Sequence, residues 1–569
     1  MDPIRYTLSF PAPHTHYVHV RAEVPTSGRD SVELSMAVWT PGSYLVREFS
    51  RHVEAVTAEG PGGGALNVEK TAKNRWRVAI PRPGSGQALG APKVVVSYRV
   101  YGREMSVRTN WIEADFAFLN GAPTFLTLAG DSARPHEVTI LPAPRWSRSI
   151  TALDAGPRPH AYCAPDYDTL VDSPILVGNP EVHEFLVDGT RHVLANVGDT
   201  TFFDGPRAVK DLEAIVRAHK SFWGTLPYDR YVFINLITEA GGGLEHARSS
   251  VLMTGRWVTR TRPSYLRWLQ LASHELFHAW NVKRLRPIEL GPFDYEREVL
   301  TPSLWVVEGI TEYYGDVLVL RAGRSSVQEF LDSLSDKIEE LQTTPGRAVR
   351  SVTQASRDAW IKLYRPDENS PNSAVSYYTK GAVVTFLLDA AIRRATGGAR
   401  TLDDVMRDAF ERYSGARGFT ADEFRALVET VAGVDLGAFW RTAIEGTGEL
   451  DYTDALDVFR LQFKPIAATP GVRPKAWIGA ATKIDAGRLL VSQVKRDTPA
   501  FAAGVNVDDE IIAIDQVRVR ADRLDERLEQ YAPGDRVSLL VARRDRLLSM
   551  DVVLGAEPPR SWRLEPRPG

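Results

Sequence analysis

The sequence predicts a multidomain α+β protein with a β-sheet domain at each end and a mostly helical domain between them. Residues 1–175 alternate apolar and polar side chains, and this period of two indicates half-buried strands of an antiparallel sheet, separated by Pro- and Gly-rich turns. Residues 176–455 carry amphipathic stretches at helical spacing, such as 207–223. Strand patterns return in residues 465–560, and residues 561–569 resemble a loose tail.

Length and composition restrict the kind of protein. At 569 residues the chain is too long for one hydrophobic core and should divide into about three or four domains. A net charge of −3 gives no electrostatic reason to expect binding to nucleic acid or an anionic membrane. Cys163 is the only cysteine, so no intrachain disulfide can form, which fits a reducing compartment. The chain shows no apolar signal core and no bilayer-spanning run; with Met1 as the native start, this predicts a cytoplasmic protein.

The central stretch His274-Glu275-Leu276-Phe277-His278 matches the pattern H-E-x-x-H. Two histidines four residues apart lie on one face of a helix, where both imidazoles can reach one metal ion. A glutamate between them can hold a water molecule and act as general base, the arrangement of zinc hydrolases. Apolar residues recur at helical spacing and no Pro or Gly interrupts residues 265–281, so a helix is predicted over this range.

A catalytic zinc ion needs a third protein ligand and one open position for water. Thirty residues after His278, a second predicted helix carries Glu308 among apolar residues, and Glu308 is the predicted third ligand. Glu312, one turn further along the same face, could instead be the ligand, or could form a hydrogen bond to a ligating histidine. The alternative without a metal is a carboxylate at a helix start and a second, solvated one.

A run of glycines precedes a third acidic residue. The predicted buried strand at residues 231–237 leads into Gly241, Gly242 and Gly243, followed by Leu244 and Glu245. Glycines let a backbone or a ligand approach closely, as a substrate site on an edge strand requires. A flexible turn is the alternative. The sequence therefore predicts substrate contacts at Gly242 and Gly243.

Several long stretches resemble one family. Residues 274–287 (HELFHAWNVKRLRP) resemble the extended zinc motif of the glycyl aminopeptidase family, gluzincins with an appended PDZ domain. Residues 39–44 (WTPGSY), 242–246 (GGLEH) and 358–370 (DAWIKLYRPDENS) resemble the same family. The resemblance implies a thermolysin-like catalytic domain in residues 176–455, one zinc ion per chain, and removal of N-terminal residues, with Gly or Ala preferred. A more distant similarity is to the aminopeptidase N type of enzyme, in which the histidine-to-glutamate gap is shorter.

That distant similarity implies two further roles. The Gly-x-Met-Glu-Asn loop of the aminopeptidase N type corresponds to residues 242–246 and assigns recognition of the substrate's free ammonium to Glu245. Its Tyr-x-Lys-Gly motif corresponds to residues 378–381 and makes Tyr378 a hydrogen-bond donor to the oxyanion, with Tyr377 as the competing choice. The long polar segment 343–373 is predicted to be a loop over the cleft.

The C-terminal strand region resembles a PDZ domain. Residues 477–480 (WIGA) match the loop with which such domains bind a terminal carboxylate. PDZ domains add a peptide strand to a sheet edge, so this copy either binds the C-terminus of a peptide or only packs against the enzyme. The sequence leaves both readings open.

The predicted function is that of a zinc aminopeptidase acting on peptides with a free N-terminus. The rival hypotheses are an endopeptidase or another zinc hydrolase with the same site, and a non-catalytic PDZ adaptor. The predicted catalytic residues are Glu275 and Tyr378, the substrate-binding residues Glu245, Gly242 and Gly243, and the metal ligands His274, His278 and Glu308.

Overall fold

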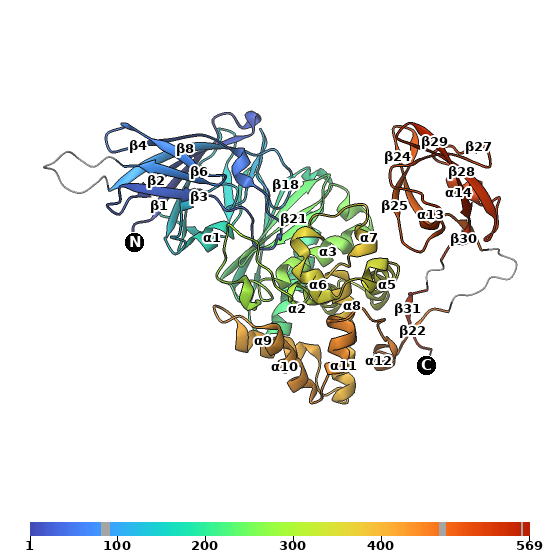
Figure 1. The fold of residues 1–569 in the computed structure, drawn as a ribbon. Helices are drawn as coiled ribbons and strands as arrows, with labels where there is room; N and C mark the ends of the chain where they lie inside the picture. Colours follow the sequence, from blue (N-terminus) through green and yellow to red (C-terminus); the bar gives the residue numbers. More distant parts are fainter. Residues whose placement is uncertain (81–91, 466–473, 559–560, 569) are drawn as a thin grey trace. The chain divides into compact units, whose positions relative to one another are not determined.

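Figure 1 shows the computed structural model, which describes residues 1–80, 92–465, 474–558 and 561–568. Contacts between residues divide the chain into two compact units. Unit 1 consists of Met1–Leu300, Tyr314–Ser326 and Met406–Phe424, and unit 2 of Thr301–Tyr313, Val327–Val405 and Arg425–Gly569. The predicted domain boundaries stay a prediction, and residues 466–473, 559–560 and 569 of the two C-terminal segments lie outside the described residues.

The N-terminal part of unit 1 is built from three β-sheets, and all strand pairs in them are antiparallel except that of β1 with β12. The alternation of apolar and polar residues explains why these segments form sheets. In β2, for example, Val18, Val20 and Ala22 are buried while His19 and Arg21 between them face solvent. The largest sheet has the order β14 (Asp154–Ala155), β15 (Ala161–Ala164), β12 (His136–Leu141), β1 (Ile4–Ser9), β2 (Tyr17–Pro25), β8 (Lys93–Tyr101), β4 (Val53–Glu59), β5 (Ala65–Leu66). The second has the order β11 (Thr127–Leu128), β3 (Ser31–Ser35), β7 (Arg75–Ala79), β6 (Val68–Ala72).

The third sheet connects the N-terminal core to the rest of unit 1. Its order is β13 (Arg148–Thr151), β16 (Ile175–Gly178), β10 (Ala117–Leu119), β9 (Trp111–Ile112). Alternate residues face two cores: Ala117 and Leu119 pack into the N-terminal core, whereas Phe118 between them packs with the apolar residues of the next sheet. The strand β10 is therefore buried on both faces.

The sheet that follows positions the site. Its order is β17 (Glu181–Val187), β18 (Thr190–Gly198), β19 (Arg230–Thr238), β21 (Ser249–Gly255), β20 (Gly242–Glu245). The three central strands are parallel and almost wholly buried, while β20 is an antiparallel edge strand. Helix α2 (Gly205–Trp223) packs on β17, and helix α3 (Arg262–Phe277) packs on β20 and β21. The site helix thus lies directly against the predicted substrate strand.

Unit 2 combines helices with a C-terminal sheet. A π-helical turn at Trp305–Gly309 continues without a break into α4 (Ile310–Arg321), and the turn packs on α8 (Thr379–Ala395), which also contacts α5 (Val327–Gln342) and α12 (Thr453–Val458). Residues 301–452 also form α6 (Val352–Arg357), α7 (Ser370–Ser373), α9 (Leu402–Tyr413), α10 (Ala421–Ala432) and α11 (Gly437–Phe439). Of these helices, α4 from Tyr314, α9 from Met406 and α10 as far as Phe424 belong to unit 1.

The C-terminal sheet of unit 2 surrounds an apolar core of its own. Its order is β24 (Ala480–Asp485), β25 (Arg488–Val494), β26 (Glu510–Ile514), β28 (Arg536–Arg543), β29 (Arg546–Val553), with β27 (Val517–Arg518) paired to β26. Two short helices, α13 (Pro499–Ala502) and α14 (Leu524–Leu528), and the pair β23 (Ala476–Trp477) with β30 (Gly555–Ala556) complete it. In the described part of the sheet, β24 pairs with β25 alone and leaves one edge open.

Three local predictions need correction. The helix predicted for residues 265–281 spans Arg262–Phe277, because the chain turns after Phe277 although buried Trp280 prolongs the apolar periodicity. The predicted loop 343–373 contains α6 and α7, the first begun by a capping box between Ser351 and Gln354. The prediction of a loose tail at residues 561–569 is wrong, because β31 (Leu564–Pro566) pairs with β22 (Leu461–Phe463) and Leu564 is buried.

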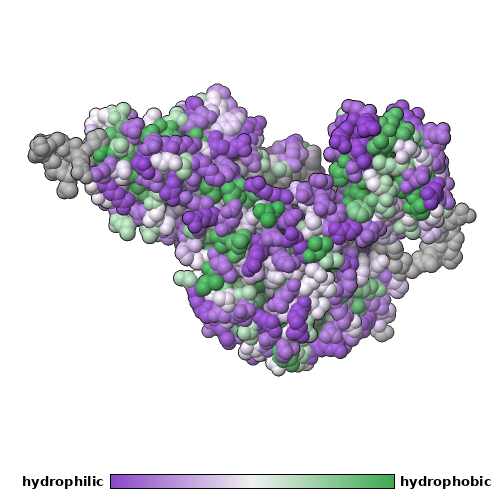
Figure 2. Space-filling model, in the orientation of Figure 1, coloured by the Kyte–Doolittle hydropathy of each residue, from purple (hydrophilic) through white to green (hydrophobic). Residues whose placement is uncertain are grey.

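The surface shown in Figure 2 is mostly hydrophilic, as expected from the composition of the chain. On the face shown in Figure 2, hydrophilic residues predominate and hydrophobic ones are scattered among them. No helix in the described part of the chain is long and apolar enough to cross a membrane. The cytoplasmic location stays a prediction.

Candidate active site

Helix α3 presents the two histidines on its buried face. The side chain of Thr261 accepts a hydrogen bond from the N–H of Ser264 at the helix start, and His274 and His278 lie in and just after the last turn. Their Nε2 atoms are 3.1 Å apart. Nδ1 of His278 lies 2.9 Å from the carbonyl oxygen of Asn281, so Nδ1 carries the proton and Nε2 keeps its lone pair.

Glu308 completes a group of possible metal ligands. It lies in the π-helical turn before α4 and is 2% exposed. Ligand atoms of His274, His278 and Glu308 all lie within 4.8 Å of one another. Glu312 belongs to neither such group among the described residues; its carboxylate lies 3.1 Å from the Lys337 ammonium. Of the two candidate carboxylates, the structure therefore brings Glu308 to the histidines.

The donor set fits zinc. Two nitrogens bound to one zinc ion at about 2.0–2.1 Å lie about 3.3 Å apart in tetrahedral geometry, close to the separation of the two Nε2 atoms. Two imidazoles and one carboxylate are also the ligands of many catalytic zinc sites, in which the fourth position is left to water or substrate. π-Helical turns occur frequently at functional sites, because they rotate one side chain out of the regular helical order.

The edge strand β20 lies so close to Glu275 that only glycine fits. A Cβ atom built on Gly243 would come within 1.9 Å of a Glu275 carboxylate oxygen. The structure thus places Gly243 directly against the predicted general base. Gly242, the first residue of β20, has a φ of +140° and no such neighbour.

Glu245 ends β20 in a buried position beside the other carboxylate. Oxygen atoms of Glu245 and Glu275 and a nitrogen of His278 lie within 4.8 Å of one another. The turn at residues 39–44 lies against Glu245, since a Cβ atom on Gly42 would come within 2.4 Å of its carboxylate. The WTPGSY turn therefore forms part of the wall around Glu245.

A buried ion pair lies behind Glu245, and sequence analysis missed one partner. Asp172 accepts hydrogen bonds from Lys283 Nζ at 2.8 Å and from the N–H of Ala247 at 2.7 Å, and Nδ1 of His246 lies 3.1 Å from it. Burial alone would raise the pKa of Asp172, but the Lys283 ammonium and the His246 contact hold it well below its usual range. Asp172 belongs to no motif, so only the structure reveals it.

Tyr378 precedes the first residue of α8 and lies near Glu308. Burial and the Glu308 carboxylate raise the pKa of Tyr378, so its hydroxyl stays protonated at ordinary pH and can donate. Its ring stacks on Tyr377, with centroids 4.7 Å apart, and its hydroxyl lies 3.4 Å from that of Tyr364. Tyr377 is fully buried whereas Tyr378 is only partly buried. Tyr364, from the 358–370 stretch, was not singled out by the sequence analysis.

Fold and site together define the class: a metal-dependent hydrolase of the H-E-x-x-H type with a glutamate as candidate third ligand. Comparison with protein-family models identifies the family within this class. The peptidase M61 N-terminal domain matches residues 5–179, the M61 glycyl aminopeptidase domain residues 267–384, and a PDZ domain residues 476–554. The two M61 models together match more than half of the chain. The chain belongs to the M61 peptidase family and is a metallo-aminopeptidase with a C-terminal PDZ domain.

A solved structure agrees with this fold. An aminopeptidase N family protein from Idiomarina loihiensis is 29% identical over 99% of this chain and 98% of its own, with a TM-score of 0.92. The M1 zinc metallopeptidase from Deinococcus radiodurans is 16% identical, with a TM-score of 0.47 over 79% of this chain and 95% of its own, too slight a likeness to support an inference. Comparison with curated proteins found no match. The predicted fold class is confirmed.

Proposed function

We propose that the chain removes the N-terminal residue from peptides with one zinc ion held by His274, His278 and Glu308. The convergence of these three side chains beside Glu275 is the observation that carries the proposal. A zinc ion in that position would lower the pKa of a coordinated water molecule and polarise the peptide carbonyl. Proton transfer, stabilisation of the oxyanion and binding of the substrate's ammonium are assigned to the protein's own side chains.

Glu275 is the proposed general base and acid. It takes a proton from the attacking water and passes it to the nitrogen of the leaving peptide. Its contact with Gly243 keeps its carboxylate against the strand along which the substrate would lie. Tyr378 is the proposed donor to the oxygen on which negative charge develops, and one such donor typically lowers the barrier by about 3–4 kcal/mol.

Glu245 is the proposed anchor for the substrate's ammonium. An aminopeptidase must recognise a free N-terminus one residue from the bond it cleaves, and a fixed carboxylate serves this purpose. Support comes from the closeness of Glu245 to Glu275 and from the buried surroundings that hold it. Gly242 and Gly243 would bind the substrate backbone. The preference for Gly or Ala at the first position rests on the family alone.

The test compares a free alanyl peptide with its N-acetylated form, using zinc-loaded protein. We expect the free peptide to be cleaved at least about 100-fold faster, and Glu245→Gln to remove most of that difference. Glu275→Gln should abolish turnover while metal analysis still finds one zinc per chain. Equal cleavage of both peptides by the unaltered enzyme would instead favour an endopeptidase or another zinc hydrolase.

We propose further that the PDZ domain binds the C-terminal end of a peptide on β24. Support comes from the open edge of β24 and from residues 477–480, which lead directly into that strand. Calorimetric titration with a peptide acid and the matching amide provides the test. Similar heats from both would exclude recognition of a carboxylate.

A further inference from the structure

An arginine from the N-terminal part of unit 1 reaches the strand beside the proposed general base. Arg108 lies between β8 and β9, and its Nη2 atom is 3.4 Å from the carbonyl oxygen of Gly243 in β20. Gly243 is also the residue that lies against Glu275, since a Cβ atom built on it would come within 1.9 Å of a Glu275 carboxylate oxygen. The guanidinium of Arg108 and the carboxylate of Glu275 therefore lie beside the same residue of the substrate strand.

The backbone on both sides of Arg108 is held in place. Val107 is 0% exposed and packs into the same apolar core as Leu244 of β20. The side-chain amide of Asn120, which is 2% exposed, donates to the carbonyl oxygens of Val107 at 3.2 Å and Thr109 at 2.8 Å. A side chain on a segment fixed in this way presents its charge at a defined place, as a substrate-binding group requires.

The charge of Arg108 is not neutralised by a neighbour. In the part of the chain that the structure describes, Arg108 forms no ion pair, and its guanidinium has no hydrogen-bond acceptor besides the Gly243 carbonyl oxygen. A guanidinium has five N–H donors in a rigid fork that matches the two oxygens of a carboxylate. Because the Arg108 side chain is partly exposed, it keeps donors and a full positive charge for a bound anion.

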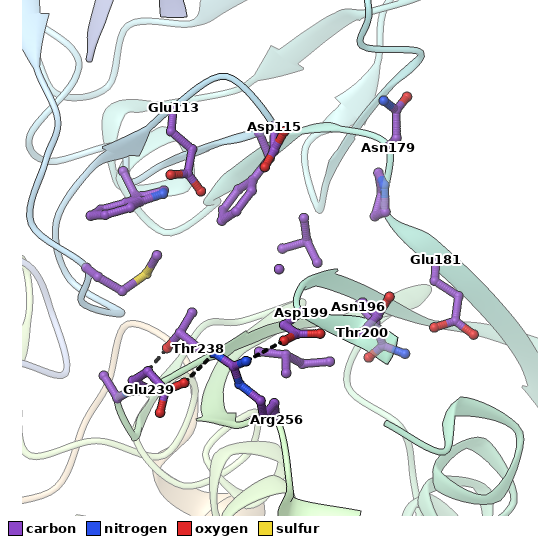
Figure 3. Close-up of a pocket in the computed structure, with 18 residues that line it drawn as sticks. Glu113, Asp115, Asn179, Glu181, Asn196, Asp199, Thr200, Thr238, Glu239 and Arg256 are labelled. Atoms are coloured by element: carbon purple, nitrogen blue, oxygen red, sulfur yellow. Dashed lines mark hydrogen bonds and ion pairs between the residues drawn. The ribbon is translucent and has the colours of Figure 1, made fainter. Parts of the chain in front are cut away.

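The acidic residues nearest to Arg108 along the chain belong to other cavities. Glu113 and Asp115 line a cavity of about 1030 Å³ beside the ends of β18 and β19, and Figure 3 shows both on one side of its open space. Glu104 lines a smaller cavity of about 260 Å³ in the N-terminal sheets. Arg108 lines neither of these two cavities. The side chain that it could most easily have paired with along the chain is thus directed elsewhere.

The place of Arg108 on β20 indicates which anion of a substrate it would meet. The proposed ammonium anchor Glu245 and the contact at Gly243 are two residues apart, about 7 Å along the strand. An extended dipeptide spans at most about 7 Å from its ammonium to its carboxylate. A bare carbonyl oxygen at Gly243 would suit the N–H of a peptide that continues, whereas the guanidinium beside it suits the carboxylate of a peptide that ends.

We propose that Arg108 binds the C-terminal carboxylate of the substrate and that dipeptides are the preferred substrates of this site. Glu245 would hold the ammonium and Arg108 the carboxylate, with the single peptide bond between them, beside Glu275. A longer peptide places an uncharged peptide group at Arg108 and loses this ion pair. The inference rests on the proposed aminopeptidase function and names the class of substrate for that site.

The test measures kcat/KM of the zinc-loaded full chain for the dipeptide Ala-Ala, for Ala-Ala amide and for Ala-Glu amide. We expect Ala-Ala to be preferred at least about tenfold over its amide at low ionic strength, and this ratio to fall as salt is added, because the bond to the carboxylate is charge-assisted. Ala-Glu amide carries its carboxylate on the side chain. A value for this amide equal to that of Ala-Ala would overturn the assignment of Arg108 to the terminal carboxylate.

Arg108→Gln should lower kcat/KM for Ala-Ala about tenfold and change that for Ala-Ala amide less than about twofold. Arg103→Gln is the matched control, since Arg103 is an exposed arginine of the same segment that stacks on the Trp111 ring, and the ratio should stay unchanged. A purely structural role of Arg108, through its contact with Gly243, would lower both values alike. An unchanged ratio in Arg108→Gln therefore overturns the proposal.

Binding gives a second readout that needs no turnover. Calorimetric titration should show that Ala-Ala binds Glu275→Gln at least about tenfold more tightly than the double variant Glu275→Gln/Arg108→Gln. Equal affinities, or equal kcat/KM of Ala-Ala and its amide with the unaltered enzyme, overturn the proposal. Failure to cleave any of the three substrates would count against the aminopeptidase function itself, so the two failures are distinguishable.

Discussion

The molecule has two edge strands that could each add a peptide strand, β20 in the catalytic sheet and β24 in the PDZ domain, and they are built in opposite ways. In β20, Leu244 is buried in the apolar core, Gly243 lies against Glu275, and the Glu245 carboxylate is covered by Gly42. In β24, four of six residues are exposed and none is buried. A strand that must hold catalytic groups in place is packed from both faces, whereas a strand that offers only backbone groups can remain exposed.

Among the substitutions that test this contrast, Gly243→Ala in β20 should have the largest effect. The new Cβ would overlap a Glu275 carboxylate oxygen, so either β20 or the general base must move by more than an ångström. A displacement of that size costs about 100-fold in rate, because catalytic groups act over narrow distances. We expect kcat to fall by about that factor, with unchanged zinc content and little change in the thermal midpoint. Steady-state kinetics with an alanyl peptide would measure it, and wild-type kcat would show that the close packing is unnecessary.

Much of the region around β20 could be predicted from the sequence because its signals are local. The histidine spacing predicted the helix face, and the glycine run predicted a close approach at β20. The structure brings ligand atoms of His274, His278 and Glu308 within 4.8 Å of one another, and their role as metal ligands stays a prediction. The strand alternation of the N-terminal domain is confirmed by burial for the same reason, since a period of two is visible over five residues.

The remaining features depend on contacts between residues distant in the chain, which periodicity cannot reveal. Gly42 covers Glu245 across about two hundred residues, and Asp172 meets Lys283 across more than one hundred. The π-helical turn that carries Glu308 has no sequence signal of its own. No local pattern indicates a partner for Lys283, whose ammonium is bound to a carboxylate from before the catalytic sheet.

The buried ion pair behind β20 gives a second contrast with β24. Because the pKa of Asp172 in the folded chain lies below that of an unfolded one, roughly 3.9, the ionised carboxylate stabilises the fold above about pH 4. That stabilisation is lost as the pH falls through the folded-state pKa. Asp172→Asn leaves the Lys283 ammonium buried without its carboxylate, and we expect a destabilisation of about 3 kcal/mol at pH 7.

Urea unfolding of this variant and the unaltered chain at pH 7, 5 and 3 would measure the effect. The difference between the two midpoints should be largest at pH 7 and smaller at pH 3, because below about pH 4 the unfolded chain binds a proton at Asp172 while the folded chain still holds this carboxylate ionised. Asp485→Asn in β24 is the matched control, since this carboxylate is exposed and should contribute within about 0.5 kcal/mol. A difference independent of pH would mean that the Asp172 charge does not stabilise the fold.

The smallest expected effect concerns the hairpin that holds β24. Asp485 pairs with Arg488 across a two-residue turn, in which Ala486 has a φ of +48° and Gly487 a φ of +78°. Both positions favour Gly or Asn in such a turn. Nothing lies within 4 Å of a Cβ built on Gly487, so Gly487→Ala should cost only the backbone strain, about 1 kcal/mol of PDZ stability. Ala486→Asn should stabilise the domain by about 0.5–1 kcal/mol. Hydrogen exchange of the β24 and β25 amides would detect both changes, and cleavage of a dipeptide should be unaffected. If Gly487→Ala slowed that reaction as Gly243→Ala is expected to, the contrast between a strand fixed for catalysis and a strand fixed only by its turn would fail.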